Sequence, residues 1–449
     1  MVSPDSSVAC QGTTAAHVPI AATILPFTAV RFDEHVPGGL AAVIGPPADL
    51  ESSERAVAFV ADRPYSAVRL EIADDPHGAR FLQARRLFDR WRQNGTLRRD
   101  TSPSYYVYEQ EFVERGVTHV RRGIFGLAPL GAPETVFLPH EDTWEENLRR
   151  RRHILRDIEA STSPILLLHD AASADLAPAF DATERLQPNG EGFDDDGQRH
   201  RLWQLSDERI ISRVRAVLAG HRFMIADGHH RFAAARGYHH ATNRPEAGFI
   251  PALCVAQDDP GVILRAIHRL FAPSMSVDWS QVLARAATWF ELQTHPVARK
   301  SGAELAALLP PGELPVYGLL TSEAEMHVLR LRSFEVSAPF VARRRPVLRH
   351  LDVTIATDLL LHHVLGIDPS AAEVGYSNDP DQVVAAVRKR EASAALLLRA
   401  PRIQQVVDVA RAHSRMPQKS TSFVPKVPLG LVMYDFYNER DDSSYVTLR

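Results

Sequence analysis

Apolar and polar positions along the chain follow the periods of strands and helices in turn. Strands are indicated where apolar residues alternate or form short runs, over residues 21–32, 66–72, 105–112, 120–130, 164–170, 200–207, 222–226, 249–257, 393–400 and 428–436. Helices are indicated by a three-to-four-residue apolar spacing over residues 77–95, 144–159, 207–219, 278–292 and 402–414. Because the two types follow no fixed order, the pattern predicts an α+β fold rather than a doubly wound one.

Two stretches depart from this periodicity. Residues 171–198 lead into the polar run EGFDDDGQRH, which lacks a core pattern and predicts an exposed loop. At the start of the chain no basic segment precedes an apolar core, so we expect a disordered tail over residues 1–20 rather than a signal peptide.

Composition narrows the class of protein. The chain has 449 residues, of which 45% are hydrophobic and 24% charged, as in globular proteins of two or three domains or one large decorated domain. A net charge of −4 indicates no nucleic-acid partner. Cys10 and Cys254 alone exclude a disulfide framework and a cysteine-rich zinc site, and they fit a reducing cytoplasm. No apolar run approaches the ~20 residues that cross a bilayer, so we expect a soluble, cytoplasmic protein without a membrane partner.

The most distinctive chemistry lies between the strand at 222–226 and an alanine-rich helix that begins near residue 232. The junction consists of Asp227, Gly228, His229, His230 and Arg231. A strand that turns abruptly into a helix leaves free N–H groups at the helix start, and these attract anions, phosphate above all. The alternative is an ordinary turn, in which Asp227 is a helix cap and the exposed histidines and arginine have no ligand.

Each residue of this junction has a chemical use near phosphate. Gly228 permits a tight turn and the close approach of a ligand, and Arg231 is suited to bidentate contact with phosphate oxygens. His229 and His230 are suited to hydrogen bonding or proton transfer near neutral pH. Asp227 is a candidate Mg²⁺ ligand or proton acceptor.

Three other segments carry candidate residues. His140-Glu141-Asp142-Thr143 precedes a predicted helix, where Thr143 and Glu146 also fit a capping box. In residues 416–421 (MPQKST), Lys419, Ser420 and Thr421 form a polar segment stiffened by neighbouring prolines; the alternative is an ordinary surface loop. Asp49 closely follows a Gly-Pro-Pro turn, and the pair His268-Arg269 is more typical of structure than of function.

Motifs of rival chemistries are missing from the sequence. There is no GxxxxGK[ST] phosphate loop, no GxGxxG dinucleotide turn, no HExxH zinc helix and no GxSxG nucleophile elbow. Kinase, dehydrogenase, metalloprotease and hydrolase classes that depend on these motifs are therefore not indicated.

The segment IADGHHRFAAA is similar to the signature of a bacterial and archaeal family long labelled as a domain of unknown function. The resemblance covers nearly the whole chain beyond the tail and includes SYYVYEQEF, the motif at 140–143, SPILLLHD and MPQKSTSFVPKVPLGL. That family is grouped with the ParB/sulfiredoxin-like fold. The resemblance implies a ParB/sulfiredoxin-like core over residues 21–245 and an additional mixed α/β C-terminal portion over 246–449 that completes the site.

One branch of this wider group, the free serine kinases, carries a similar DGHxR turn. The resemblance therefore implies a phosphotransferase that uses ATP or ADP with Mg²⁺ to phosphorylate serine or a serine-like metabolite. It implies catalytic roles for Glu141, Asp227, His229 and His230, with Asp227 also binding the metal. Nucleotide or phosphate would contact Gly228, Arg231, His140, Thr143, Lys419, Ser420 and Thr421.

The chain departs from the family at Pro46-Pro47-Ala48-Asp49, where relatives tend to have Pro-Pro-Tyr-Asp. Asp49 is kept as a candidate substrate contact, but the loss of the aromatic residue leaves the bound small molecule open. Two other functions also remain open. One is a phosphatase acting on phosphoserine-like esters, and the other is a non-catalytic nucleotide-binding switch.

Overall fold

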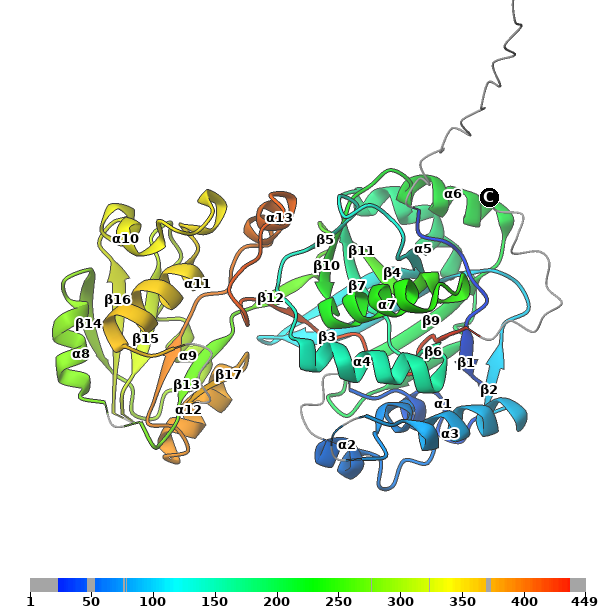
Figure 1. Ribbon diagram of the computed structural model, residues 1–449, viewed down its shortest axis with the longest axis horizontal. Helices are drawn as coiled ribbons and strands as arrows, with labels where there is room; N and C mark the ends of the chain where they lie inside the picture. Colours follow the sequence, from blue (N-terminus) through cyan, green and yellow to red (C-terminus); the bar gives the residue numbers. More distant parts are fainter. Residues whose placement is uncertain are drawn as a thin grey trace, which may run out of the picture.

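The computed structural model describes residues 23–46, 53–75, 77, 79–275, 277–322, 324–368 and 373–436. It shows a mixed α/β protein with several sheets, the largest of eight and six strands. Figure 1 shows the two large sheets in separate lobes, joined by segments that run between them. The tail predicted over residues 1–20 lies outside the described residues.

The eight-stranded sheet forms the centre of the first lobe. Its order is β5-β10-β7-β11-β4-β3-β9-β8, and only the β10–β5 and β11–β7 pairs are parallel. The strands are β5 (Phe137–Pro139), β10 (Phe223–Asp227), β7 (Ile165–His169), β11 (Phe249–Ala256), β4 (Val117–Pro129), β3 (Tyr105–Glu114), β9 (Arg199–Leu205) and β8 (Gly190–Phe193). The helices of this lobe are α1 (Gly39–Val43), α2 (Ser53–Phe59), η1 (Ala67–Glu71), α3 (Leu82–Gln93), α4 (Glu145–Ile158), η2 (Ser173–Leu176), α5 (Ala177–Thr183), α6 (Glu208–Leu218), α7 (His229–Thr242) and η3 (Glu246–Gly248).

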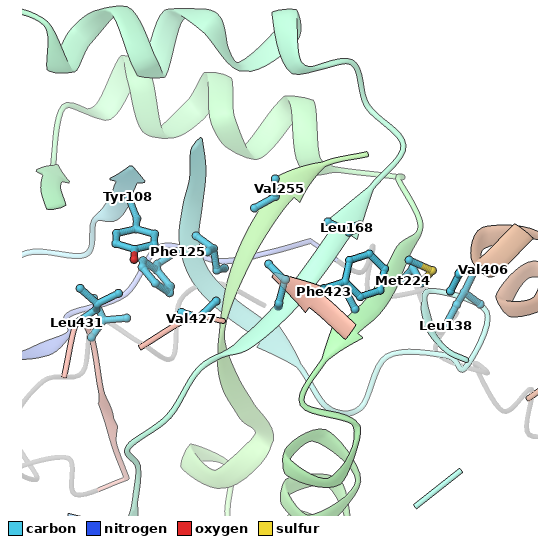
Figure 2. Packing of buried hydrophobic residues seen from close by; sticks show 14 of the residues in the cluster. Tyr108, Phe125, Leu138, Leu168, Met224, Val255, Val406, Phe423, Val427 and Leu431 are labelled. Atoms are coloured by element: carbon cyan, nitrogen blue, oxygen red, sulfur yellow. The ribbon is translucent and has the colours of Figure 1, made fainter. Parts of the chain in front are cut away.

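Alternation along the central strands places apolar side chains on both faces of this sheet. In β7, Ile165 and Leu167 join a cluster that includes side chains of α4 and α7, whereas Leu166 and Leu168 join a cluster on the other face. This second cluster contains side chains from residues 406–432, although these lie far away in the sequence. Figure 2 shows its members Val406, Phe423, Val427 and Leu431 together with Tyr108, Phe125, Leu138, Leu168, Met224 and Val255.

The second lobe is built on the antiparallel sheet β14-β16-β15-β18-β13-β17. Its strands are β13 (His268–Phe271), β14 (Phe290–Pro296), β15 (Val316–Leu320), β16 (Glu325–Leu331), β17 (Val374–Ser377) and β18 (Ala394–Leu397). Its helices are α8 (Trp279–Ala286), α9 (Gly302–Ala306), α10 (Phe334–Val341), η4 (Pro346–Leu348), α11 (Asp352–Ile355), a π-helical stretch over Ala356–Leu365 and α12 (Pro380–Arg388). Buried aliphatic and aromatic side chains fill this lobe.

The chain then returns to the first lobe through α13 (Ile403–Arg411), β19 (Ser422–Val424) and β20 (Tyr434–Asp435). β19 pairs with β12 (Ile263–Arg265), and β20 pairs with β6 (Ala160–Ser161). A further pair joins β1 (Val30–Phe32) and β2 (Leu97–Arg99). The final part of the chain therefore reaches the eight-stranded sheet after the second lobe is complete.

Most long periodic segments form the predicted elements. The strands expected at 105–112, 120–130, 164–170, 200–207, 222–226 and 249–257 correspond to β3, β4, β7, β9, β10 and β11. The helices expected at 77–95, 144–159 and 207–219 correspond to α3, α4 and α6. These elements combine a strong apolar period with a core to pack against, so local pattern and tertiary packing agree.

Some predicted segments differ from the structure, and three of them are instructive. Residues 66–72 form the short helix η1 rather than a strand, with four of its five residues buried. In the segment predicted to be an exposed loop, β8 pairs with β9, because an edge strand gains backbone hydrogen bonds without needing an apolar face. In the segment 428–436 only β20 is a strand, since the apolar residues there are buried in irregular backbone.

The domain boundary predicted after residue 245 lies just before β11, which pairs with β7 and β4 in the eight-stranded sheet. The change from one large sheet to the other thus comes between β11 and β13. The assignment of the first part to a ParB/sulfiredoxin-like core stays a prediction. Among the described residues, no helix has both the length and the apolar character that a membrane span needs.

Candidate active site

The Asp-Gly-His-His-Arg junction is a sharp turn from β10 into α7. Gly228 caps the helix with a φ of 95°, and α7 begins at His229, three residues before the predicted start. A Cβ at Gly228 would lie 2.7 Å from Cγ2 of Ile165 on the neighbouring strand β7. Glycine is therefore required by both the backbone conformation and the space. His229, His230 and Arg231 form the first turn of the helix, whose N–H groups have no intrahelical acceptor.

Asp227 is held between two cations. Its carboxylate forms ion pairs with the guanidinium of Arg231 and the ammonium group of Lys426, and Arg231 also donates to the carbonyl of Pro164. Burial alone would raise the pKa of Asp227, but Lys426 and Arg231 lower it far below its ordinary value. Asp227 is thus ionised, and the Arg231 side chain points into the protein rather than outward.

His140 and His229 form a buried pair beside this cluster. The backbone N–H of His140 donates to Nε2 of His229 at 3.2 Å, and the two rings are nearly perpendicular with centroids 4.5 Å apart. Burial lowers the pKa of both imidazoles, that of His140 to about 3. Both rings are therefore neutral at physiological pH, and Nε2 of His229 acts as an acceptor.

Glu141 joins the first lobe to the returning C-terminal segment. Its Oε1 accepts hydrogen bonds from the hydroxyl of Thr421 at 2.8 Å and from the Thr421 N–H at 3.2 Å. The Thr421 hydroxyl is also 2.8 Å from Nε2 of His140. Burial raises the pKa of Glu141, although the Thr421 hydrogen bonds and Lys426 act in the opposite direction. A raised pKa moves this carboxylate toward the range in which a general base works best.

His230 fixes the start of the neighbouring helix. Its Nε2 accepts the backbone N–H of Trp144 at 3.0 Å, and Trp144 is the N-cap of α4. The alternative in which Thr143 and Glu146 form a capping box is not found, because α4 begins after Trp144 and has no side-chain cap. A histidine from the distant turn thus binds the N–H group at the start of this helix.

The segment 416–421 lies beside the residues at 140–143. The Met416 N–H donates to the His140 carbonyl at 2.8 Å, and Thr421 bonds to Glu141. Lys419 is exposed, whereas Ser420 is buried and donates its hydroxyl to the Pro417 carbonyl. The structure thus brings three separated segments together, while the chemical role of each residue stays a prediction. Asp49 lies outside the described residues.

A metal site built on Asp227 does not fit this arrangement. Both carboxylate oxygens of Asp227 already face cations. Within the described parts of the chain, no group of three or more His, Cys, Asp or Glu side chains is placed to hold a metal ion. The binding of Mg²⁺ by Asp227 stays a prediction, and in this structure the carboxylate is paired with Arg231 and Lys426.

Three further basic residues lie near this cluster, and sequence reasoning gave a site role only to Lys426 among them. Lys426 contacts Asp227 directly, and Arg415 donates to the Pro139 carbonyl at 2.9 Å. Arg269, from the second lobe, lies near enough to Glu141 for the two charges to interact. For Lys426 the signal was its place in the proline-rich closing segment, but no local pattern indicates Arg415 or Arg269.

The sequence profile of a family described as "Protein of unknown function (DUF1015)" matches residues 24–354. The chain belongs to the DUF1015 family. The range that this DUF1015 profile matches contains the turn at 227–231 and the residues at 140–143. It ends before the segment 416–421, although Thr421 completes the hydrogen bonding of Glu141.

Solved structures similar to this DUF1015 chain include a free serine kinase in complex with AMP, at 14% identity and a TM-score of 0.37, covering 69% of this chain and 90% of that one. A conserved hypothetical protein from Pyrococcus furiosus has 15% identity and a TM-score of 0.34, covering 68% and 95%. SbnI with a C-terminal truncation, from Staphylococcus aureus, has 10% identity and a TM-score of 0.36, covering 72% and 91%. No curated protein matches the chain. At these TM-scores the likenesses carry no argument about ligand or reaction.

Proposed function

We propose that this protein is a phosphotransferase that moves a phosphoryl group from ATP or ADP to the hydroxyl of serine or a serine-like small molecule. The observation that carries the proposal is the setting of Glu141. This carboxylate is only half-buried, one of its oxygens is held by Thr421, and burial raises its pKa. A positioned carboxylate of this kind is suited to receive a proton from a substrate hydroxyl.

The surroundings of Glu141 favour an anionic co-substrate. Lys426, Arg231, Arg415 and Lys419 are the cations that act most strongly on the pKa values of the site, and Asp227 is the carboxylate that opposes them. The N-terminus of α7 adds its N–H groups and the positive end of the helix dipole. Phosphoryl transfer depends mainly on such positioning and charge neutralisation.

The proposed step is a direct displacement. The substrate oxygen attacks the terminal phosphorus of the nucleotide, and the bond from that phosphorus to the bridging oxygen breaks. The hydroxyl proton passes to Glu141, and the shortened nucleotide leaves with the electron pair of the broken bond. We derive no step through a metal ion, because Asp227 is already paired.

Other residues have positioning roles in this proposal. Arg231 and Lys426 hold Asp227 at the end of β10, and His229 and His140 hold the backbone that carries Glu141. The first turn of α7, including His230, binds phosphate through main-chain N–H groups. Gly228 allows the phosphate to approach, and Thr143, Lys419, Ser420 and Thr421 are the proposed contacts on the opposite side.

The proposal is tested by incubating the protein with L-serine and either ATP or ADP, with and without Mg²⁺, and following products by ³¹P NMR. Formation of O-phosphoserine with stoichiometric loss of nucleotide supports the proposal. Release of inorganic phosphate from O-phosphoserine without nucleotide would identify a phosphatase instead. Nucleotide binding without turnover of serine, glycerate or related hydroxy compounds would identify a binding switch and reject the transferase.

A further inference from the structure

Arg269 on β13 is a buried cation without a carboxylate partner. Its residue is 2% exposed, and none of the ion pairs found within 4.0 Å in the described part of the chain includes it. Its Nη1 donates to the Ile267 carbonyl, its guanidinium lies 5.1 Å from the centroid of the Tyr376 ring, and its Nε has no hydrogen-bond partner. A neutral carbonyl and an aromatic ring compensate only part of the cost of burying this charge.

Other buried arginines are better satisfied. Arg151 and Arg231 form ion pairs with Glu71 and Asp227. Arg121, which also lacks an ion pair, donates one Nη to Gln110 and the other to the Pro425 carbonyl. Arg269 thus stands apart as a buried guanidinium with a single hydrogen bond to the described residues, which leaves its fork of donors available to a ligand.

Strand pairing links β13, which carries Arg269, to the segment that holds Glu141. Arg269 is opposite Tyr376 in the β13–β17 pair. Two residues further on, Asn378 donates to the hydroxyl of Ser422 at 2.7 Å. Ser422 follows Thr421, whose hydroxyl and N–H bind Glu141. The second lobe therefore meets the site through the same returning segment that holds Glu141.

Electrostatics agrees with this placement. Burial lowers the pKa of Arg269 to about 10, and electrostatic interactions with Tyr376 and Glu141 act in the opposite direction. His268, the neighbour of Arg269, does not fill the same role. Its Nδ1 accepts the Leu398 N–H at 3.2 Å, and burial lowers its pKa to about 4. Only Arg269 of this pair is left with unused donors and a charge.

We propose that Arg269 binds the carboxylate of the small-molecule substrate, so that the second lobe supplies specificity for a hydroxy acid or hydroxy amino acid. This inference rests on the proposed function, in which Glu141 receives the proton of the substrate hydroxyl. A planar guanidinium fork matches a carboxylate with two parallel hydrogen bonds. The hydroxyl is then bound by the first lobe and the carboxylate by the second, and a substrate must carry both groups to span them.

The test uses the full-length protein and its variants Arg269→Met and Arg269→Lys, with Arg330→Met as the matched control. Arg330 is exposed on β16 of the same sheet. Thermal shifts are recorded with L-serine, glycerate, inorganic phosphate and serinol, which resembles serine but lacks the carboxylate. We expect L-serine or glycerate to raise the Tm of the wild type and of Arg330→Met, serinol to have no effect, and Arg269→Met to lose the response.

The same melts separate a binding role from a structural one. Removing an uncompensated buried charge should leave the Tm of the ligand-free protein unchanged or raise it by a few degrees. A lower Tm for Arg269→Met together with an intact response to L-serine or glycerate would overturn the inference. So would a wild type that responds to neither acid, or one that responds equally to serinol. A response to inorganic phosphate alone would also overturn it, since the anion would then be phosphate.

Kinetic measurements of phosphoryl transfer distinguish the failure of this inference from the failure of the proposed function. If phosphoryl transfer occurs, Arg269→Met should raise the KM for the acid by at least about 30-fold and leave the Kd for nucleotide unchanged, with Arg269→Lys intermediate. A KM change within about 3-fold would reject the inference and leave the transferase standing. If the wild type shows no transfer but Arg269→Met abolishes the acid-dependent shift, the transferase is rejected and the carboxylate site stands.

Discussion

The two lobes differ in how their buried charged side chains are paired. In the first lobe, buried charged side chains form ion pairs, such as Asp227 with Arg231 and Lys426 or Glu71 with Arg151, and Arg121 instead donates hydrogen bonds to Gln110 and the Pro425 carbonyl. In the second lobe the interior is apolar, and Arg269 is the only buried Asp, Glu, Lys or Arg in the described residues between 266 and 400. That one residue lacks a carboxylate partner, and its charge interacts with that of Glu141.

This difference between the lobes distinguishes buried charged side chains that stabilise the structure from those that bind a ligand. A buried ion pair offsets its own desolvation and therefore supports the position of the groups around it. A buried charge that lacks a partner carries a cost in the free protein that only an oppositely charged ligand removes. On this reading, Asp227 and Arg231 hold the turn in place, whereas Glu141 and Arg269 are the groups that meet substrate. The following predictions test that separation.

The largest effect on stability is expected for Asp227→Asn. The substitution leaves Arg231 buried without its carboxylate, which should lower the free energy of unfolding by about 3 to 5 kcal/mol. The control is Glu134→Gln, which breaks an exposed ion pair with Arg236. Arg236 lies on α7, as Arg231 does, and the loss should be less than about 1 kcal/mol. Chemical denaturation of both variants gives the comparison. Equal small losses would show that Asp227 is not part of a structural ion pair.

Gly228→Ala should destabilise the protein by about 2 to 4 kcal/mol. The left-handed backbone at Gly228 and the contact of a new Cβ with Ile165 on β7 both contribute. Gly220→Ala is a useful control, because Gly220 also has a positive φ but its Cβ would meet nothing within 4 Å. The difference between the two variants in denaturant unfolding measures the steric part. No difference would mean that β7 moves away without cost.

Acid should destabilise the protein before its carboxylates titrate. Burial lowers the pKa of His268 and His169 to about 4, below the ordinary value of about 6.5 in an unfolded chain. Between these values the unfolded state binds more protons, so stability falls as the pH drops below about 6.5. Each such histidine contributes up to about 1.4 kcal/mol per pH unit.

The control for this pH dependence is His268→Asn, in which the amide oxygen can still accept the Leu398 N–H. The variant should be less stable or equal at neutral pH but should lose less stability between pH 6.5 and 5. Urea unfolding at several pH values measures the slope. Parallel pH profiles for the wild type and the variant would contradict the assignment of His268 as a neutral buried ring.

The smallest effect is expected for Thr143→Ala. Because α4 is capped at Trp144 and has no side-chain cap, the loss should stay within about 0.5 kcal/mol. A true capping threonine would cost about 1 kcal/mol. His230→Ala provides the contrast, since it removes the acceptor of the Trp144 N–H and should shift the melting temperature more than Thr143→Ala does.

The location of the candidate site could be predicted from sequence because its chemistry is locally dense. The turn at 227–231 and the residues at 140–143 each combine several functional side chains at the end of a strand. The inward direction of the Arg231 side chain was harder to predict from the sequence. Asp227 lies four residues before Arg231, and this spacing is compatible with their ion pair. The sequence pattern predicts which residues lie close together. It does not predict which of them form ion pairs with each other and are therefore not free to bind a ligand.

Contacts between segments that are distant in the sequence could not be predicted from the apolar and polar pattern. The cap that His230 gives to α4, the pairing of Lys426 with Asp227 and the approach of Arg269 all depend on packing across large sequence separations. The same reason explains β8, which forms because β9 offers an unpaired edge rather than because its own residues alternate. Residues 66–72 have the alternating pattern of a strand, but they form the buried short helix η1. Tertiary packing therefore overrides the local apolar period.

The most direct test of the account is Glu141→Gln, measured for both turnover and nucleotide binding. Glutamine keeps an oxygen that accepts the Thr421 hydrogen bonds, but it cannot take a proton from substrate. Asp142→Asn, a neighbouring exposed carboxylate, serves as the control. We predict that Glu141→Gln slows phosphoryl transfer by at least about 100-fold, leaves the Kd for nucleotide within about 2-fold, and leaves Asp142→Asn fully active. Turnover of Glu141→Gln within about 3-fold of the wild type would contradict the account.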